Sequence, residues 1–230
     1  MKIHGFQKLT LLDYPGMTAC TLFFAGCNFR CPFCHNAPLV TDIDNTAVYD
    51  EAEVLSFLER RQGILDGVCI TGGEPLMQPD LALFIGKIKA LGYKVKLDTN
   101  GSAPDKLKAM IDSGLIDYVA MDIKNRKEKY AQTVGVEHFD ITPIEESVSL
   151  LLEGKVDYEF RTTVVKEYHT VDDIEAISRW IKGATKYYLQ NFVDSGNLIG
   201  TDMSAVSKET LELMKSTAEK NLNFVETRGI

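Results

Sequence analysis

The stretch TACTLFFAGCNFRCPFCHN, residues 18–36, joins a run of apolar and β-forming residues to a loop that holds three cysteines. The run predicts a buried strand, because strands covered on both faces carry nearly continuous apolar residues. Cys27, Cys31 and Cys34 follow with the spacing C-x3-C-x2-C, and no fourth cysteine lies close by in the sequence. The loop therefore stands at the carboxyl end of the first predicted strand.

Similar apolar runs recur along the chain, and helical patterns fill the intervals between them. The predicted strands are 18–26, 67–73, 93–101, 117–124, 157–165 and 186–192. The predicted helices are 50–62, 79–92, 104–114, 142–154, 171–183 and 204–221, several of which open with Pro or end at Gly. This alternation predicts an α/β fold with parallel strands and outer helices.

The number of strand–helix units limits the architecture. Six units are too few for the complete eight-unit barrel. A partial (β/α)6 TIM-like barrel fits the count, and an open flavodoxin-like sheet fits the periodicity almost as well. No Pro/Ser-rich linker or break in composition divides the chain, so we expect a single domain over 1–230. Within it we expect an N-terminal segment (1–17), a (β/α)6 core (18–192) and a C-terminal helix and tail (193–230).

The composition excludes several classes of partner. Apolar residues make up 45% of the chain, and 25 Lys and Arg against 33 Asp and Glu give a net charge of −8. An acidic chain is a poor nucleic-acid binder, because that binding depends on Lys and Arg at the phosphates. No signal-peptide pattern opens the sequence, and no apolar run approaches the ~20 residues that span a bilayer. We expect a cytoplasmic protein without nucleic-acid or membrane partners.

Four interpretations of the cysteine loop compete. A disulfide is disfavoured in a cytoplasmic protein and would leave one thiol over. Structural zinc needs four ligands, and the adjacent Cys34 and His35 would rarely point to one metal. Buried structural cysteines would not gather beside Asn28 and Arg30. An iron–sulfur cluster is ordinarily held by four thiolates. With three, one iron keeps an open position that can bind a small molecule, and we favour this interpretation.

The cysteine loop resembles the sequence motif of a known enzyme family. The C-x3-C-x2-C spacing with the aromatic Phe33 before the last cysteine resembles the signature of the radical S-adenosylmethionine (SAM) enzymes. The resemblance implies that Cys27, Cys31 and Cys34 hold a [4Fe–4S] cluster and that SAM binds its fourth iron. In that family an electron from the reduced cluster cleaves SAM to methionine and a 5′-deoxyadenosyl radical, which takes a hydrogen atom from the substrate.

Other predicted strand ends would then line the same site, since reactive groups of such folds lie at the carboxyl ends of the strands. Gly72 and Gly73 of TGGEP leave their backbone accessible to a ligand, and Glu74 could accept a hydrogen bond or orient the loop. The alternative is a plain strand-to-helix turn. The expected cofactor contacts are Phe33, Gly72, Gly73, Glu74, Asp98, Thr99, Asp122, Lys124 and Arg161.

The charged residues of this set could each bind a part of SAM or a cation, or have another role. Asp98 and Asp122 could bind the ammonium or ribose hydroxyls of SAM, or a cation, although Asp98 also suits an Asx turn. Lys124 could pair with the SAM carboxylate or remain a solvated charge. Arg161 lies in the apolar run YEFRTTVV, where an unpaired charge is unfavourable, so it should have a carboxylate partner.

Residues 4–36, HGFQKLTLLDYPGMTACTLFFAGCNFRCPFCHN, narrow the resemblance to glycyl-radical-enzyme activating enzymes. DTNG, DIK and VG further along the chain also match. The resemblance implies an oxidoreductase that forms a glycyl radical on a partner enzyme, in first place anaerobic ribonucleoside-triphosphate reductase, with a flavodoxin or ferredoxin as electron donor. Alternatives are a pyruvate formate-lyase-type activase and a small-molecule enzyme similar to 7-carboxy-7-deazaguanine synthase.

The same resemblance implies two finer assignments. Asp13 matches an aspartate that contacts the target peptide, although Tyr14 stands where the family has a small residue, so the turn should differ in shape. Asp98, Thr99 and Asp122 match positions that bind a monovalent cation beside SAM. Residues 125–142 are expected to form a long loop, either a mobile flap for the partner or a plain connection, and we favour the flap because loops of this length are often functional.

Overall fold

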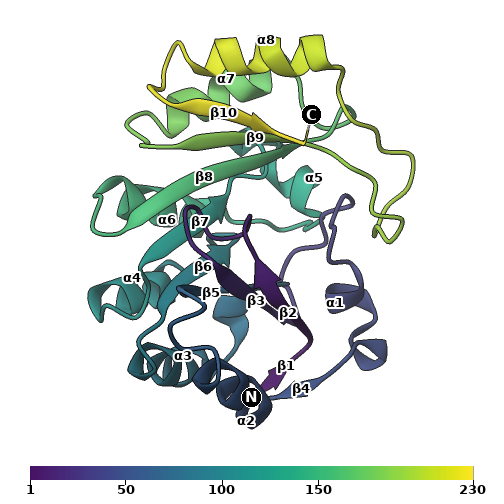
Figure 1. Ribbon diagram of the computed structural model, residues 1–230. Helices are drawn as coiled ribbons and strands as arrows, with labels where there is room; N and C mark the ends of the chain where they lie inside the picture. Colours follow the sequence, from purple (N-terminus) through teal and green to yellow (C-terminus); the bar gives the residue numbers. More distant parts are fainter. Residues whose placement is uncertain (230) are drawn as a thin grey trace.

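The main body is an eight-stranded sheet with the strand order β10-β9-β8-β7-β6-β5-β3-β2. This computed structural model describes residues 1–229. The strands of the large sheet are β2 (Gly5–Thr10), β3 (Ala19–Phe24), β5 (Gly67–Gly72), β6 (Lys94–Thr99), β7 (Tyr118–Asp122), β8 (Asp157–Val164), β9 (Tyr187–Asn191) and β10 (Val225–Arg228). All neighbours are parallel except β2, which runs antiparallel to β3. The sheet curves into a barrel whose order ends at β2 and β10, so it is open between these strands (Figure 1).

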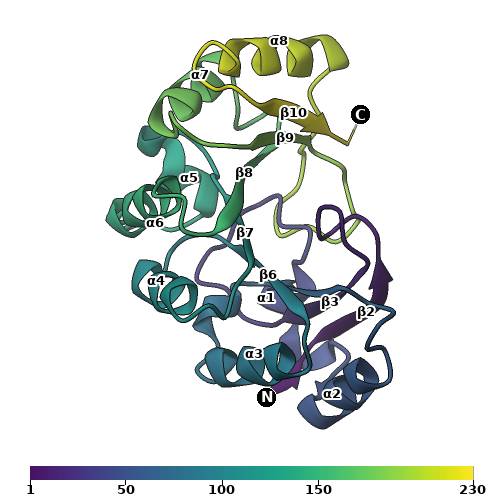
Figure 2. The same cartoon turned by 60° about the vertical axis from the view of Figure 1, so that its left-hand side comes forward.

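Helices cover the outer face of the sheet (Figures 1 and 2). They are α2 (Glu51–Glu59), α3 (Leu81–Ala90), α4 (Pro104–Asp112), α5 (Tyr130–Val134), α6 (Thr142–Leu152), α7 (Val171–Trp180) and α8 (Lys208–Ala218). The short α1 (Pro38–Thr41) lies apart from them, directly after the cysteine loop (Figure 1). Short 3-10 turns span Ile43–Asn45, Pro75–Met77 and Lys127–Lys129. Helix α7 begins at a capping box formed by Thr170 and Asp173, which satisfies backbone donors at its first turn. Within residues 1–229, no helix has the length and apolarity needed to cross a membrane.

The partial barrel of parallel strands with outer helices is confirmed, and the six predicted strands correspond to β3 and β5 to β9. Two strands of the sheet were not predicted. Strand β2 precedes the cysteine loop as an antiparallel edge, and β10 adds a parallel edge near the end of the chain. A separate pair, β1 (Lys2–Ile3) and β4 (Tyr49–Asp50), joins the N-terminus to the start of α2. The predicted loop at 125–142 contains α5, so it is partly helical.

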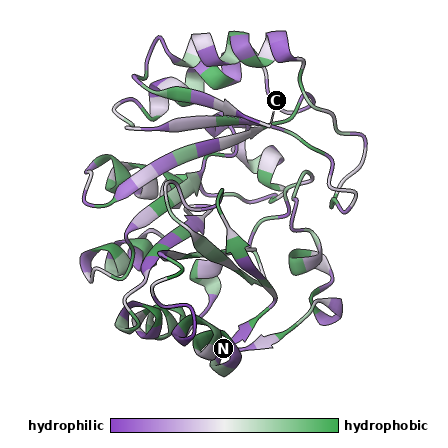
Figure 3. Ribbon diagram, in the orientation of Figure 1, coloured by the Kyte–Doolittle hydropathy of each residue, from purple (hydrophilic) through white to green (hydrophobic). Residues whose placement is uncertain are grey.

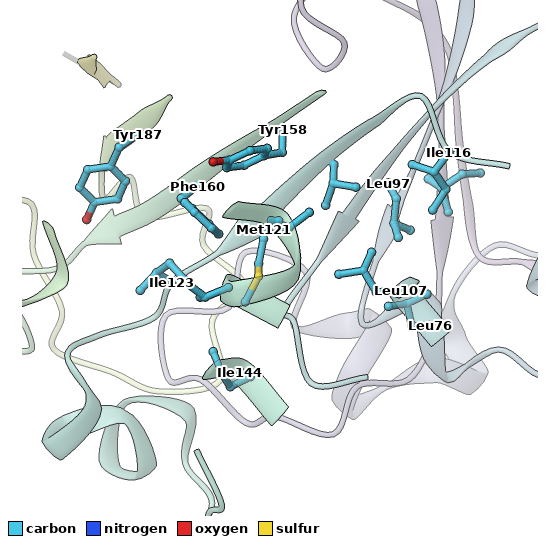
Figure 4. Packing of buried hydrophobic residues seen from close by; sticks show 14 of the residues in the cluster. Leu76, Leu97, Leu107, Ile116, Met121, Ile123, Ile144, Tyr158, Phe160 and Tyr187 are labelled. Carbon is cyan, nitrogen blue, oxygen red and sulfur yellow. The ribbon is translucent and has the colours of Figure 1, made fainter. Parts of the chain in front are cut away.

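The main hydrophobic core lies between the sheet and the helices. Leu97, Met121 and Phe160 come from three neighbouring strands, and they are fully buried in one cluster with Leu107 of α4 and Ile144 of α6 (Figure 4). Burying a side chain of this size contributes roughly 1.5–3 kcal/mol. The helices are thus held on the sheet by apolar contacts at every second strand position.

The inner face of the barrel is polar, which explains the alternation of hydropathy along strands such as β8 (Figure 3). Lys96 and Asp98 are two positions apart on β6 and therefore share a face. In register beside them stand Cys69 on β5 and Tyr118 on β7, while Asp122 on β7 pairs with Arg161 on β8. Parallel sheets covered on both faces are normally apolar on both. A polar inner face indicates a binding cavity instead.

Candidate active site

The cysteine loop begins directly after β3 and is braced by its own backbone. The Cys34 N–H donates to the Cys31 carbonyl (3.1 Å), and the Phe29 N–H donates to the Cys27 Sγ (3.4 Å). The Arg30 guanidinium donates to the carbonyls of Cys27 (2.6 Å) and Phe29 (2.8 Å), which closes the first turn of the loop. As a result all three cysteines line one cavity of about 220 Å³ at the carboxyl ends of the strands.

The thiols fit a cluster better than a single ion. Within the described residues 1–229, no three His, Cys, Asp or Glu side chains converge as ligands of one metal ion. A cubane has separate irons, so its three cysteines need to surround a cavity rather than meet at a point. Burial raises the pKa of the Cys31 thiol to about 12, so a thiolate at that position requires a positive centre beside it. The donor set therefore suits the [4Fe–4S] cluster implied by the spacing.

The two glycines at the end of β5, Gly72 and Gly73, allow close backbone packing as well as access for a ligand. A Cβ on Gly72 would lie 2.2 Å from the Phe24 carbonyl oxygen, and one on Gly73 would lie 2.0 Å from that of Gly26. The φ of Gly72 is +125°, a conformation that side chains rarely adopt. The Gly73 N–H donates to Phe24 (2.8 Å) and that of Glu74 to Gly26 (2.8 Å). Both glycines line the cavity. The N–H groups of Gly73 and Glu74 are occupied by these hydrogen bonds, which hold the end of β5 against the start of the cysteine loop.

Glu74 lies behind the cavity wall and does not line the cavity. Its carboxylate is fully buried and accepts from the Leu76 N–H (3.1 Å), the Thr99 hydroxyl (2.9 Å) and the Asn100 N–H (2.7 Å). Of its two predicted roles, direct ligand contact and loop orientation, the structure favours the second. Thr99, in contrast, lines the cavity, but its hydroxyl turns outward to Glu74 and also accepts from the Gly101 N–H (3.1 Å).

Glu74 gives a testable pH dependence of stability. Burial raises the pKa of its carboxyl to about 7, above the 4.5 of an ordinary glutamate. Because the folded pKa is the higher one, this contribution to stability is complete below about pH 4.5 and declines as the pH rises through 7. The decline should be on the order of 3 kcal/mol. Urea unfolding at pH 5, 6.5 and 8 should show it in the wild type and not in Glu74→Gln.

Glu74→Gln also loses stability through its hydrogen bonds, because the single amide oxygen cannot accept from all three donors. We expect it to be less stable than the wild type at pH 5 by about 1–3 kcal/mol, with a smaller difference at pH 8. Glu53→Gln, an exposed position on α2, is the matched control and should follow the wild-type curve. Parallel pH curves for the wild type and Glu74→Gln would contradict the assignment.

A network of charged side chains forms the opposite wall. Arg161 donates to Asp98 through Nη1 (3.2 Å) and to Asp122 through Nε (3.0 Å), so it has the predicted carboxylate partners. Lys124 donates to the second oxygen of Asp122 (2.9 Å), and Lys96 donates to Asp98 from below. Burial alone would raise the pKa of both carboxyls, but the neighbouring cations hold each pKa below its ordinary value.

The predicted residues Asp98, Asp122, Lys124 and Arg161 all line the cavity with the three cysteines, and so does Phe33. The Phe33 ring packs against Tyr168 (centroids 5.6 Å apart) and His169 (6.3 Å). His169 in turn accepts the Val165 N–H at Nδ1 (3.1 Å) and approaches the Lys124 carbonyl through Nε2 (2.8 Å). These contacts fix one side of the cavity.

Asp13, like Glu74, is a predicted residue that does not line the cavity. It lies in the loop before β3, where its carboxylate accepts from the Thr21 hydroxyl. Tyr14 packs against Tyr118 at the amino-terminal end of the barrel, 6.0 Å between ring centroids. Asp13 thus lies on the inner face but does not line the cavity, and its contact with a peptide remains a prediction.

Several lining residues were not singled out in the sequence. Asn36 donates to the Gly72 carbonyl (2.9 Å), and Asn100 donates to the Asn28 side chain (2.9 Å), so both amides tie the cysteine loop to the strand ends. The His35 ring stacks on Phe192 (5.8 Å) and bonds the Val193 carbonyl through Nε2 (2.9 Å). The His35-Asn36 pair directly after the last cysteine of the loop was the available signal, but partners this distant in sequence could not be inferred from it.

Comparison with known proteins defines the class. The model of the radical SAM superfamily matches residues 21–181. The chain therefore belongs to the radical SAM superfamily, and its cofactors are those of the family, a [4Fe–4S] cluster and SAM. A protein of Methanocaldococcus jannaschii, assigned provisionally by its name to the glycyl-radical enzyme activating enzymes, is 33% identical over 196 residues, 83% of this chain and 79% of that protein.

Further relatives agree with this placement. The pyruvate formate-lyase-activating enzyme of Clostridium pasteurianum is 26% identical over 209 residues, 81% of this chain and 85% of that enzyme. Among solved structures, SuiB of Streptococcus suis bound to its precursor peptide SuiA has a TM-score of 0.70 at 14% identity, over 91% of this chain and 48% of SuiB. QueE of Escherichia coli has a TM-score of 0.60 at 16% identity, over 100% and 94%. At these identities the structures support the fold alone.

Proposed function

We propose that this protein is an activating enzyme that forms a glycyl radical on a partner enzyme. One observation carries the proposal: three cysteines with the radical SAM spacing share a cavity with the charged wall of Asp98, Asp122, Lys124 and Arg161. The similarity to glycyl-radical enzyme activating enzymes over most of the chain supports the reaction class. When bound, the cluster and SAM supply the reductive cleavage of SAM and the abstraction of a hydrogen atom from the substrate.

The residues of this chain then have distinct tasks. Cys27, Cys31 and Cys34 would hold the cluster from one side of the cavity. The cationic side chains Lys124 and Arg161 on the opposite side favour a carboxylate, which SAM carries. The Lys124 ammonium lines the cavity and has three N–H donors, so it can donate to a ligand carboxylate while keeping its contact with Asp122. This arrangement would hold the methionine part of SAM between the two walls.

Other residues would orient the ligand and restrict water. Gly72 and Gly73 bring uncovered backbone to the cavity, where the Gly73 carbonyl can accept from the SAM ammonium while the Gly72 carbonyl accepts from Asn36. Phe33 and Val40 add apolar surface to the lining, which reduces the water around the reacting groups. Glu74 would act through the strand-end loop whose backbone it binds rather than by direct contact.

The substrate we propose is a backbone glycine of a partner protein, in first place anaerobic ribonucleoside-triphosphate reductase. The opening of the barrel between β2 and β10 supports access for a peptide segment, and Asp13 on the adjacent loop is the proposed contact. A pyruvate formate-lyase-type partner is the alternative within the same reaction. A flavodoxin or ferredoxin would supply the electron, and the cytoplasm is the compartment that suits such partners.

The experiment is anaerobic reconstitution with iron and sulfide, reduction, and addition of SAM. We expect about four irons per chain, and release of 5′-deoxyadenosine. With each candidate partner added, electron paramagnetic resonance should show the doublet of a glycyl radical. A partner whose target glycine is replaced by alanine is the control and should show no doublet. Release of 5′-deoxyadenosine without a doublet on either partner would favour a small-molecule substrate of the deazaguanine-synthase kind.

A further inference from the structure

Lys96 is a lysine on the inner face of the barrel whose side chain is only 2% exposed. A buried ammonium is costly unless it is paired and hydrogen-bonded. Lys96 donates to Asp98 Oδ1 and lies 3.8 Å from the Cys69 Sγ. It does not line the cavity, whereas Asp98 does. Lys96 therefore stands directly behind a carboxylate that faces the ligand.

The carboxylates of this wall are hydrogen-bonded to protein cations through both of their oxygens. Asp98 uses Oδ1 for Lys96 and Oδ2 for Arg161, with the Thr71 hydroxyl 3.4 Å from Oδ2. Asp122 uses Oδ1 for Arg161 and Oδ2 for Lys124. Each of the four carboxylate oxygens thus has a cationic donor.

These contacts do not fit the monovalent cation that the family resemblance implies for Asp98, Thr99 and Asp122. A potassium or sodium ion in a protein needs several oxygen ligands that replace its hydration shell. Here the carboxylate oxygens are already paired, and the Thr99 hydroxyl is bonded to Glu74 (2.9 Å).

The summed charge of these side chains also disfavours a bound cation. Lys96, Lys124 and Arg161 carry three positive charges against two negative charges on Asp98 and Asp122, so these five side chains sum to 3 − 2 = +1. The neighbouring Glu159 does not change this sum, because it is paired with Arg228. A further cation would meet like-charge repulsion in a poorly solvated site, where Coulomb interactions are strong.

We propose that the Lys96 ammonium is a built-in replacement for a bound monovalent cation, and that it positions Asp98 for ligand binding without any added metal ion. Lys96 is a positioning residue, because it acts on the cavity through the Asp98 carboxylate. Its attachment to β6 makes the positive charge part of the fold. The ligand-binding half of this inference rests on the proposed function of the cavity.

The experiment compares potassium, sodium and tetramethylammonium chloride at one ionic strength. The first measurement is the dissociation constant of SAM for the reconstituted protein, by equilibrium dialysis. We expect the wild type to bind SAM equally in all three salts. Lys96→Met should bind SAM about tenfold more weakly in tetramethylammonium, because it leaves the partly buried Asp98 carboxylate short of a partner. Potassium or sodium should restore most of this loss in a saturable way.

The second measurement is the thermal unfolding of the protein without cluster or SAM. An ion that binds only the folded state raises the midpoint with its concentration. We expect potassium to raise the midpoint of Lys96→Met and to leave that of the wild type unchanged. Lys94→Met is the matched control on the same strand, since Lys94 is 57% exposed, and it should behave as the wild type does.

The outcomes separate the two proposals. A saturable response of the wild type to potassium would overturn the role of Lys96, and so would a folded Lys96→Met that ignores every cation. If methionine prevents folding, Lys96→Gln tests the same point with a polar side chain, and the wild-type measurement decides independently. A wild type that binds no SAM in any salt would refute the proposed function, while the unfolding experiment would still decide the role of Lys96.

Discussion

Replacing Cys31 with alanine is expected to abolish cluster binding and SAM cleavage together. Cys31 is the central cysteine of the loop and the most buried of the three, so the two remaining thiols would leave a further iron without a protein ligand. After anaerobic reconstitution we expect iron content, the brown cluster absorbance and 5′-deoxyadenosine release all to fall to background. Iron analysis, the visible spectrum and chromatography of the nucleoside measure these three quantities.

The chain contains a matched control. Cys20 lies on β3 with its side chain fully buried in the hydrophobic core, where a free cysteine behaves as a small apolar residue. Cys20→Ala should keep its iron and its SAM cleavage and lose only a little stability. Full iron content in Cys31→Ala would show that the ligands have been assigned wrongly.

Replacing Arg161 with methionine is expected to destabilise the protein by about 2–3 kcal/mol, because it removes the shared partner of two partly buried carboxylates. Asp98 and Asp122 would then face each other with one lysine each. Urea unfolding without cofactors measures the loss of stability, and equilibrium dialysis should show weaker SAM binding after reconstitution. Arg179→Met, on the exposed face of α7, should change stability by no more than about 1 kcal/mol.

The same variant should change the response to acid. The cations hold the pKa of Asp98 and of Asp122 below the ordinary value, so these pairs contribute stability that is complete above about pH 4 and is lost as the pH falls through the lower folded values. Without Arg161 this loss should be smaller. A wild type and an Arg161→Met variant with equal stability, or with equal acid sensitivity, would count against the network.

The strand–helix order could be predicted because its signals are local. Apolar runs, Pro at helix starts and Gly after helix ends act within about a dozen residues, and the six parallel strands formed where these signals stood. The polar edge strand β10 escaped prediction, because Val-Glu-Thr-Arg resembles an exposed tail. Its Arg228 donates to both oxygens of the buried Glu159 (3.1 Å each), a contact that only the folded sheet brings about.

For the candidate site, the identity of most residues could be predicted from the sequence, but the direction of their side chains could not. The cysteine spacing and the charged strand ends named most of the residues that line the cavity. Their orientation was harder to predict, because a residue at a strand end can turn inward or outward. Glu74 and the Thr99 hydroxyl turn away from the cavity and bind each other (2.9 Å), while Lys96, which no motif marked, turns inward beneath Asp98.

By itself, the sequence determined the order of the elements and the loop of three thiols, since both follow from residues that are neighbours in the chain. The tertiary structure alone decided which acid meets which base on the inner face of the barrel. Those pairs join residues far apart in the chain, 39 positions for Arg161 with Asp122 and 63 for Arg161 with Asp98. Their geometry depends on the register of parallel strands, which the crossover helices set and no short stretch of sequence encodes.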